Sequence, residues 1–177
     1  MSRHTLSVLV ENKPGVLTRV SGLFARRAFN IHSLAVGETE NPEISRITLV
    51  VDCDRLPLEQ VTKQLNKLVN VIKIVELDDE SSVQRKLLFV KVAANDSNRA
   101  NVLQVVDLYR ARVIDMVPES ISIEITGPDS KNEAFLTALA PYGVKEIVQS
   151  GIVAIGRGPR SLSEKVSAEI QSRRSDD

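Results

Sequence analysis

The chain has 177 residues, of which 42% are hydrophobic and 26% are charged, a composition that fits one medium or two small globular domains. Lys and Arg together number 23, as do Asp and Glu, so there is no overall charge that would attract nucleic acid or an anionic membrane. The single cysteine excludes an intrachain disulfide and a Cys-rich zinc site, and no apolar run approaches the length of a membrane span or a signal peptide. We therefore expect a cytoplasmic protein.

The first part of the chain predicts the element order β-α-β-β-α-β. Strands are indicated by alternation of apolar and polar residues, and helices by apolar residues three and four positions apart. In chain order, these elements are expected at residues 5–11, 14–27, 31–36, 44–51, 57–68 and 69–76. The apolar side of the first helix is expected to comprise Val16, Leu17, Val20, Leu23, Phe24 and Ala28.

The same order then repeats. An acidic and polar stretch, residues 79–84, has nothing to bury and is expected to be a linker between domains at residues 1–78 and 85–177. The repeat is expected at residues 86–92, 98–109, 112–117, 120–126, 129–140 and 144–148, with residues 151–158 extending the last strand and residues 161–174 forming a short helix. This duplication predicts an α+β protein of two ferredoxin-like βαββαβ units, each an antiparallel sheet with two helices on one face.

Helices on one face leave the other face of each sheet to be covered. Alternation in the second and third strands predicts apolar side chains there, among them Leu34, Val36, Leu49 and Val50. Exposed apolar surface of this extent marks an interface, so we expect the sheets to pair in a homodimer through edge strands, faces or both.

The loop Asn12-Lys13-Pro14-Gly15 joins the first strand to the first helix. Pro14 suits the first turn of a helix because its nitrogen has no hydrogen to donate, and Gly15 leaves the backbone open to close approach. Asn12 can cap the helix or turn its amide toward a guest. The loop therefore predicts either an ordinary helix start or a site whose free N–H groups hold a small carboxylate. The corresponding residues 95–100 of the second unit include neither Pro nor Gly.

Side chains suited to catalysis are scarce. His4 and His32 lie on or near predicted strands, and no nucleophile motif accompanies them. Cys53 lies between Asp52 and Asp54, whose negative charges disfavour its thiolate form. No cluster of His, Cys and Asp has metal-ligand spacing. We expect neither a catalytic residue nor a metal site.

RNA-binding modules share the β-α-β-β-α-β order, and they stack bases on aromatic side chains of the sheet. Aromatic residues make up only 3% of this chain, and Phe89 is the main one on a predicted strand. An RNA-binding module would reveal itself by salt-dependent RNA binding.

The loop and the strands around it carry a family resemblance. Residues 6–24, followed by Asn30-Ile31-His32-Ser33-Leu34, resemble the N-terminal ACT domain of the acetohydroxyacid synthase (acetolactate synthase) small subunit. Ser45-Arg46-Ile47-Thr48 and residues 64–71 match later signatures of that subunit, and the resemblance continues through the second unit.

The resemblance implies a non-catalytic regulatory subunit for branched-chain amino-acid biosynthesis. Its partner would be a catalytic large subunit that condenses 2-ketoacids with thiamine diphosphate, Mg and FAD, none of which this chain would bind. The chain would activate that subunit and confer feedback inhibition by a branched-chain amino acid, usually valine. The alternative is a stand-alone ACT amino-acid sensor that acts on another partner.

In the family, the effector binds where the ACT domains of a homodimer meet. Carried over to this sequence, the effector-binding residues are Asn12, Gly15, Val16, Leu17, Asn30 and Ile31. The resemblance implies that backbone N–H groups of residues 15–17 hold the carboxylate of the effector, that the two Asn amides fix its charged ends, and that the apolar side chains contact its isopropyl group.

Overall fold

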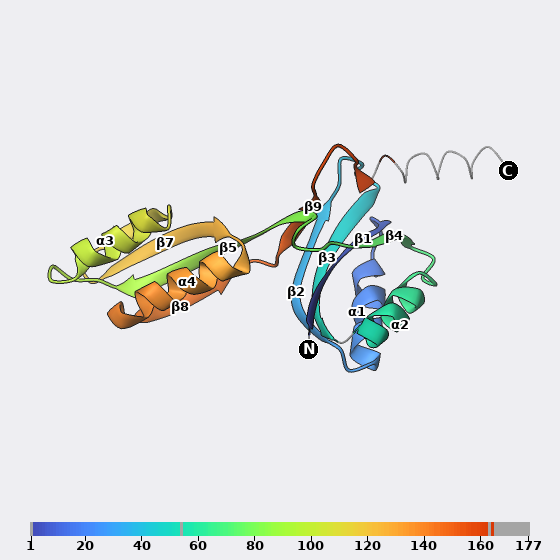
Figure 1. The fold of residues 1–177 in the computed structure, drawn as a ribbon, viewed down its shortest axis with the longest axis horizontal. Helices are drawn as coiled ribbons and strands as arrows, with labels where there is room; N and C mark the ends of the chain where they lie inside the picture. The colour runs from blue at the N-terminus through green and yellow to red at the C-terminus, as the bar shows by residue number, and fades with distance from the viewer. Residues whose placement is uncertain (1, 54, 163, 165–177) are drawn as a thin grey trace. The chain divides into compact units, whose positions relative to one another are not determined.

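The structure is a computed structural model that describes residues 2–53, 55–162 and 164. The chain forms two compact units. Unit 1 extends to Val83 and includes the segment that begins at Ala154, and unit 2 is Gln84–Val153. Each unit has an antiparallel sheet with two helices against one face (Figure 1). The predicted α+β class with two βαββαβ units is therefore confirmed.

Unit 1 has the predicted element order. Its elements are β1 (Ser2–Glu11), α1 (Val16–Arg26), β2 (Asn30–Glu38), β3 (Ile44–Cys53), α2 (Arg55–Leu65) and β4 (Val71–Glu76). The strand order is β2-β3-β1-β4, so β2 forms one edge of the sheet. Because β1 and β2 both pair antiparallel with β3, they run in the same direction.

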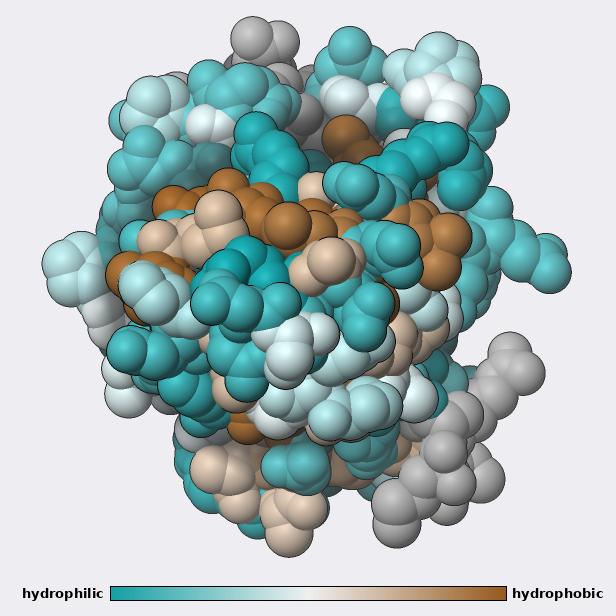
Figure 2. Space-filling view, turned by 90° about the vertical axis from the view of Figure 1, so that its left-hand side faces the viewer, coloured by the Kyte–Doolittle hydropathy of each residue, from teal (hydrophilic) through white to brown (hydrophobic). Residues whose placement is uncertain are grey.

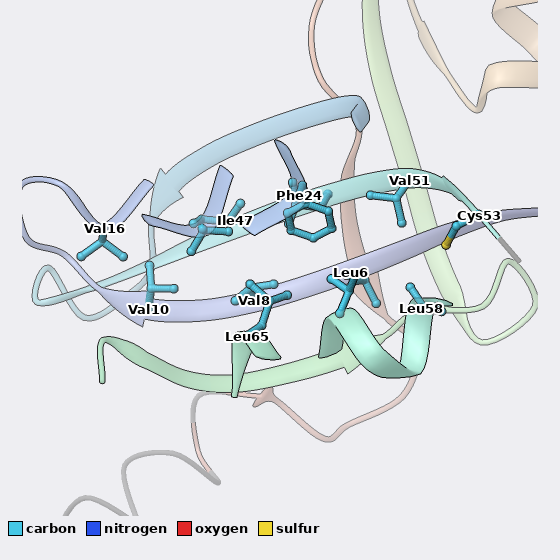
Figure 3. Close-up of a cluster of buried hydrophobic side chains, with 13 residues drawn as sticks. Leu6, Val8, Val10, Val16, Phe24, Ile47, Val51, Cys53, Leu58 and Leu65 are labelled. Atoms are coloured by element: carbon cyan, nitrogen blue, oxygen red, sulfur yellow. The ribbon is translucent and has the colours of Figure 1, made fainter. Parts of the chain in front are cut away.

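The core of unit 1 lies between the two helices and one face of the sheet (Figure 3). Its buried side chains are aliphatic apart from Phe24 and Cys53, and they include alternate residues of β1, namely Leu6, Val8 and Val10. Two expected core residues lie elsewhere. Leu17 is 40% exposed because the buried line of α1 follows Val16, Val20 and Phe24, and Leu17 is turned away from that line. Ala28 lies beyond the end of α1 with a positive φ of 56°.

Unit 2 repeats this topology. Its elements are β5 (Ser82–Ala93), α3 (Arg99–Leu108), β6 (Arg112–Val117), β7 (Ser120–Gly127), α4 (Asp129–Leu139) with a 3-10 turn η1 (Ala140–Tyr142), and β8 (Val144–Gln149). The strand order is β6-β7-β5-β8. The edge strand β6 exposes several large apolar side chains, and Figure 2 shows apolar side chains gathered in a band on the surface of the molecule.

The residues after β8 differ from their prediction. They do not extend β8, because the Ser150 hydroxyl accepts the N–H of Leu87 and donates to the carbonyl of Gly151 at the strand end. A separate short strand, β9 (Val153–Gly156), pairs with β5 instead. β5 itself begins inside the expected linker, residues 79–84. The expected helix at 161–174 lies almost entirely outside the described residues.

The second face of the unit 1 sheet is covered by the chain itself, which corrects the expected open face. Thr48 and Val50 point to that face, yet both are buried. Leu77, which continues the register of β4 opposite Thr5, is also buried, and Arg46 donates to the carbonyl of Ala154 at 3.5 Å. Farther along the sheet, Leu162 packs against a cluster of Leu9, Ile44 and Ile72.

Apolar surface remains at the β2 edge of unit 1. Leu34 is 36% exposed and Val36 is 48% exposed, whereas their cross-strand neighbours on β3, Leu49 and Ile47, are buried. The edge of this sheet is therefore the part of it that resembles an interface, and the face is not.

Candidate functional site

The Asn12 side chain ties the loop after β1 to the turn between β2 and β3. Its Nδ2 donates to the Glu38 carboxylate at 3.2 Å and to the carbonyl of Pro42 at 2.9 Å. Its backbone N–H donates to the carbonyl of Glu43 at 2.7 Å. The amide points across to this turn, and no side chain in the described part of the chain caps α1. Of the two roles that the sequence left open for Asn12, capping of the helix is not the one that the structure shows.

Gly15 immediately precedes α1 and has φ 83° and ψ −9°, a left-handed conformation that residues with a side chain adopt at a cost. Because a left-handed residue cannot belong to a right-handed helix, α1 begins at Val16 and Pro14 lies before it. A Cβ added to Gly15 would meet no atom within 4 Å. The space in front of this backbone is open.

The start of α1 offers unpaired donors. Among the described residues, the N–H groups of Gly15, Leu17 and Thr18 have no hydrogen-bond partner. The N–H of Val16 reaches the carbonyl of Lys13 only at 3.4 Å, and the helical ladder begins with Arg19 donating to Gly15 at 3.1 Å. Free N–H groups and the positive end of the helix dipole suit a small carboxylate.

Asn30 and Ile31 lie at the other end of the sheet. Asn30 pairs with Asp52 on β3, whereas Glu11, next to the loop, pairs with Ile44. Asp52 and Ile44 are eight residues apart, which corresponds to about 26 Å along a strand. Asn30 is exposed, and Ile31 packs partly against the unit 1 core. One copy of the chain therefore does not bring the two parts of the expected site together.

A short polar chain that the sequence did not reveal flanks the loop. The Glu11 carboxylate accepts from Asn70 Nδ2 at 2.7 Å and lies 3.1 Å from Lys13 Nζ. The hydrogen bond from Asn70, and then the contact with Lys13, hold the pKa of Glu11 below its ordinary value. Arg19 Nη1 donates to Asn70 Oδ1 at 2.9 Å. No motif marks Asn70, because its contacts depend on the turn before β4 folding back against β1.

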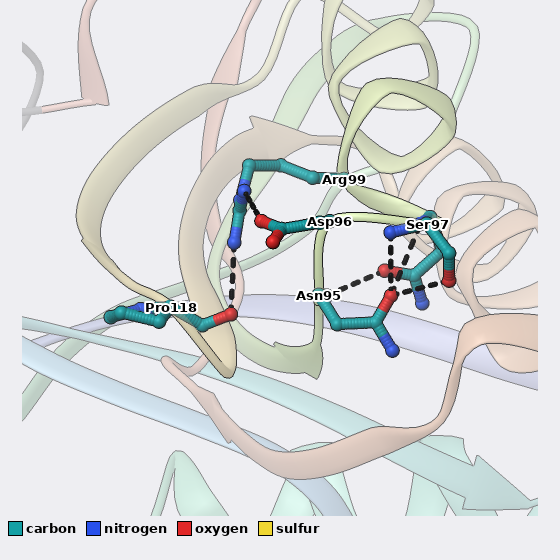
Figure 4. A network of polar contacts seen from close by, with 6 residues as sticks. Asn95, Asp96, Ser97, Arg99 and Pro118 are labelled. Carbon is teal, nitrogen blue, oxygen red and sulfur yellow. Dashed lines mark hydrogen bonds and ion pairs between the residues drawn. The ribbon is translucent and has the colours of Figure 1, made fainter.

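The corresponding loop of unit 2 is filled by its own side chains (Figure 4). Asn95 Oδ1 accepts from the N–H of Ser97 at 2.9 Å, and Asn98 Oδ1 accepts from the N–H of Asn95 at 2.7 Å. Arg99 pairs with Asp96 at 2.7 Å and donates to the carbonyl of Pro118 at 2.8 Å. The polar groups of this loop bind one another.

The described residues show no arrangement of side chains for metal binding. Within residues 2–53, 55–162 and 164, no three His, Cys, Asp or Glu side chains lie close enough to hold an ion. Cys53 is buried in the core of unit 1. His4 Nδ1 lies 2.7 Å from the Glu76 carboxylate on the sheet. In the same part of the chain, no helix is long and apolar enough to cross a membrane.

Two known protein families together match most of the chain. A family described as the AHAS small subunit-like ACT domain matches residues 6–73, and one described as the small subunit of acetolactate synthase matches residues 85–158. The chain is 59% identical over 159 residues to the acetolactate synthase small subunit of Mycobacterium bovis, which covers 90% of this chain and 95% of that protein. The chain belongs to the acetolactate synthase small-subunit family.

More distant family members agree over the same length. A probable acetolactate synthase small subunit of Archaeoglobus fulgidus is 49% identical over 156 residues, covering 88% of this chain and 98% of that protein. The crystal structure of the Thermotoga maritima acetolactate synthase small subunit has a TM-score of 0.82 and 42% identity, and it covers 90% of this chain and all of that one. The ACT-domain match contains all six expected effector-binding residues.

Proposed function

We propose that this chain is the regulatory subunit of acetolactate synthase and binds a branched-chain amino acid between two ACT domains. Family membership supports the partnership with a catalytic large subunit. One observation supports the binding site: α1 begins without a side-chain cap at a left-handed glycine that faces open space. The N–H groups of Gly15, Leu17 and Thr18 would hold the α-carboxylate of the effector.

Pairing of two β2 edges would complete this site. In a two-fold antiparallel pair centred near Leu34, Asn30 of one copy lies opposite Glu38 of the other. Asn12 is hydrogen-bonded to Glu38 within each copy. Asn30 and Ile31 of one copy would therefore approach the Asn12 loop of the other, and the dimer would carry two identical sites. The exposed apolar side chains of the edge, Leu34 and Val36, would be buried in the same step.

Different side chains would bind different parts of the effector. The side chain of Val16 is 5% exposed and belongs to the core, whereas the exposed Leu17 would offer its side chain to the isopropyl group of valine. The amide of Asn30 from the second copy would fix the polar end of the effector. A site that binds the carboxylate, the ammonium and a branched side chain together selects a free branched-chain amino acid over an isolated carboxylate.

The proposed regulation is a two-state coupling between effector binding at the paired β2 edges and the activity of the catalytic subunit. The empty subunit supports an active catalytic partner, and the effector favours a dimer arrangement that does not. A coupling free energy of about 1–3 kcal/mol would produce inhibition of several-fold to over a hundredfold. The chemistry would belong to the catalytic subunit with its thiamine diphosphate, Mg and FAD.

Calorimetry and activity measurements test the proposal together. Valine, leucine and isoleucine are titrated into the purified chain, alone and in complex with the catalytic subunit. We expect saturable binding of at least one of them with one effector per protomer, activation of the catalytic subunit, and inhibition over the same concentration range. A chain that activates the catalytic subunit but binds no branched-chain amino acid would refute the effector site. A chain that binds an amino acid but neither joins nor activates the catalytic subunit would be a stand-alone sensor.

A further inference from the structure

One residue touches both elements that flank the proposed effector loop. Asn70 lies in the connection between α2 and β4, just before β4 begins. Its carbonyl accepts the N–H of Glu11 at 2.9 Å, and its Nδ2 donates to the Glu11 carboxylate at 2.7 Å. Its Oδ1 accepts from Arg19 at 2.9 Å. Glu11 is the last residue of β1 and Arg19 lies in the first turn of α1, so Asn70 spans the loop from outside.

We propose that Asn70 is a positioning residue for effector binding, an inference that rests on the proposed function. By holding Glu11 and Arg19 at once, Asn70 fixes the distance between the end of β1 and the start of α1. That distance sets the direction of the free N–H groups at Gly15 and Leu17. A carboxylate site made of backbone donors loses affinity when those donors turn away, because each hydrogen bond depends on its angle.

The loop has few other restraints, which is why this contact matters. Asn12 fixes its beginning through the turn at Pro42 and Glu43. Within the described chain, no side chain caps the helix that follows, and the environment of Gly15 is open. The Asn70 side chain is thus the polar link between the first turn of α1 and the central strand.

The hydrogen bond from Asn70 to Glu11 can be tested by exchanging their amide and carboxylate groups, which have nearly the same shape. In Asn70→Asp, the new carboxylate still accepts from Arg19, but it also faces the Glu11 carboxylate where a donor stood at 2.7 Å. Two like charges at this separation repel, so the link opens. In the double variant Glu11→Gln with Asn70→Asp, the amide at position 11 donates and the carboxylate at position 70 accepts. The hydrogen bond is restored with its direction reversed.

The experiment measures valine affinity by calorimetry on the full-length chain, with melting temperature and maximal activation of the catalytic subunit recorded for every variant. In mildly alkaline buffer, where repulsion between the two carboxylates is strongest, Asn70→Asp should bind valine about tenfold more weakly or worse. The double variant should return to within about threefold of the unaltered chain. Asn66→Ala is the matched control, since this exposed asparagine of the same connection makes no side-chain hydrogen bond among the described residues. Its affinity should not change.

Each outcome decides the proposal. A purely structural role would lower the melting temperature without changing the affinity of the folded chain, and would overturn the inference. A double variant that binds no better than Asn70→Asp would do the same. Should Asn70→Asp fail to fold, Arg19→Ala removes only the α1 side of the link at an exposed position, and unchanged affinity in that variant would refute it. An unaltered chain that binds no branched-chain amino acid would instead refute the proposed function.

Discussion

Replacing Gly15 with aspartate places a charged side chain at the mouth of the proposed effector site. The change is compatible with folding, because the added Cβ would meet no atom within 4 Å. Its left-handed backbone, with φ 83°, is disfavoured by roughly 1–2 kcal/mol for residues other than glycine, and by less for aspartate. We expect a chain that remains folded and still activates the catalytic subunit.

The expected loss of affinity for the effector is much larger than this cost to folding. A carboxylate at position 15 would stand about 4 Å from the carboxylate of bound valine, and two like charges at that distance near a protein surface repel by about 4 kcal/mol. That repulsion corresponds to about a thousandfold loss of affinity. Gly15→Ala carries a backbone strain at least as large as that of Gly15→Asp. It adds a similar Cβ without the charge, so a larger loss in Gly15→Asp isolates the electrostatic contribution.

The assay compares valine inhibition of the assembled enzyme with calorimetric binding to the isolated chain. Gly15→Asp should lose both while activation persists, and Gly15→Ala should lose less affinity than Gly15→Asp. If Gly15→Asp kept its full sensitivity to valine, the effector would not lie at the start of α1. Equal losses in the two variants would show that the free N–H groups are not facing an anion.

Four further results are expected. Leu34→Asp should shift the chain toward monomer in analytical ultracentrifugation and remove valine binding. A dimer that survives this substitution would contradict the proposed pairing of β2 edges. The lowered pKa of Glu11 means that its stabilising contribution is present above the ordinary pKa of glutamate and is lost as pH falls through the lower folded value, so Glu11→Gln should show a flatter acid-unfolding curve. NMR titration of Asn70→Ala should place the pKa of Glu11 closer to its ordinary value. Phe24→Ala should lower the free energy of unfolding of unit 1 by about 3–5 kcal/mol in denaturant titrations, because this ring is fully buried, and a change below about 1 kcal/mol would contradict the core assignment.

Local pattern was sufficient to predict the six elements of each βαββαβ unit, but not the separate strand β9. The strand at 112–117 has the predicted ends, and the remaining elements of both units occur in the predicted order, because periodicity and turn residues are properties of neighbouring positions. The exposure of Leu17 could not be predicted in this way. Spacing placed it on the apolar side of α1, but the direction in which that helix faces the sheet depends on packing with β1 and β3, and Leu17 is left exposed at the mouth of the loop.

Contacts between distant parts of the chain could not be predicted in this way. The cover of the unit 1 sheet comes from Ala154, which lies 108 residues after Arg46, and from Leu162, which lies 90 or more residues after the strand residues around it. The direction of the Asn12 amide depends on the turn at Pro42. The separation of Asn12 from Asn30 follows from strand register, which the sequence of β2 alone does not specify.

The two units show that a shared fold does not by itself provide a binding site. Both place a loop between a central strand and a helix, and in neither does a described side chain cap the helix that follows. In unit 2 the loop satisfies its own polar groups, with Asn95 and Asn98 bonded to loop N–H groups and Arg99 bonded to Asp96. In unit 1 a left-handed glycine replaces these groups, so the donors at the helix start stay unpaired while Asn70 holds the frame from outside. If recognition depends on these unpaired N–H groups, a side chain that occupies the space in front of them should abolish effector binding. Substitution of Ser97 in the loop of unit 2 should leave the affinity for valine unchanged.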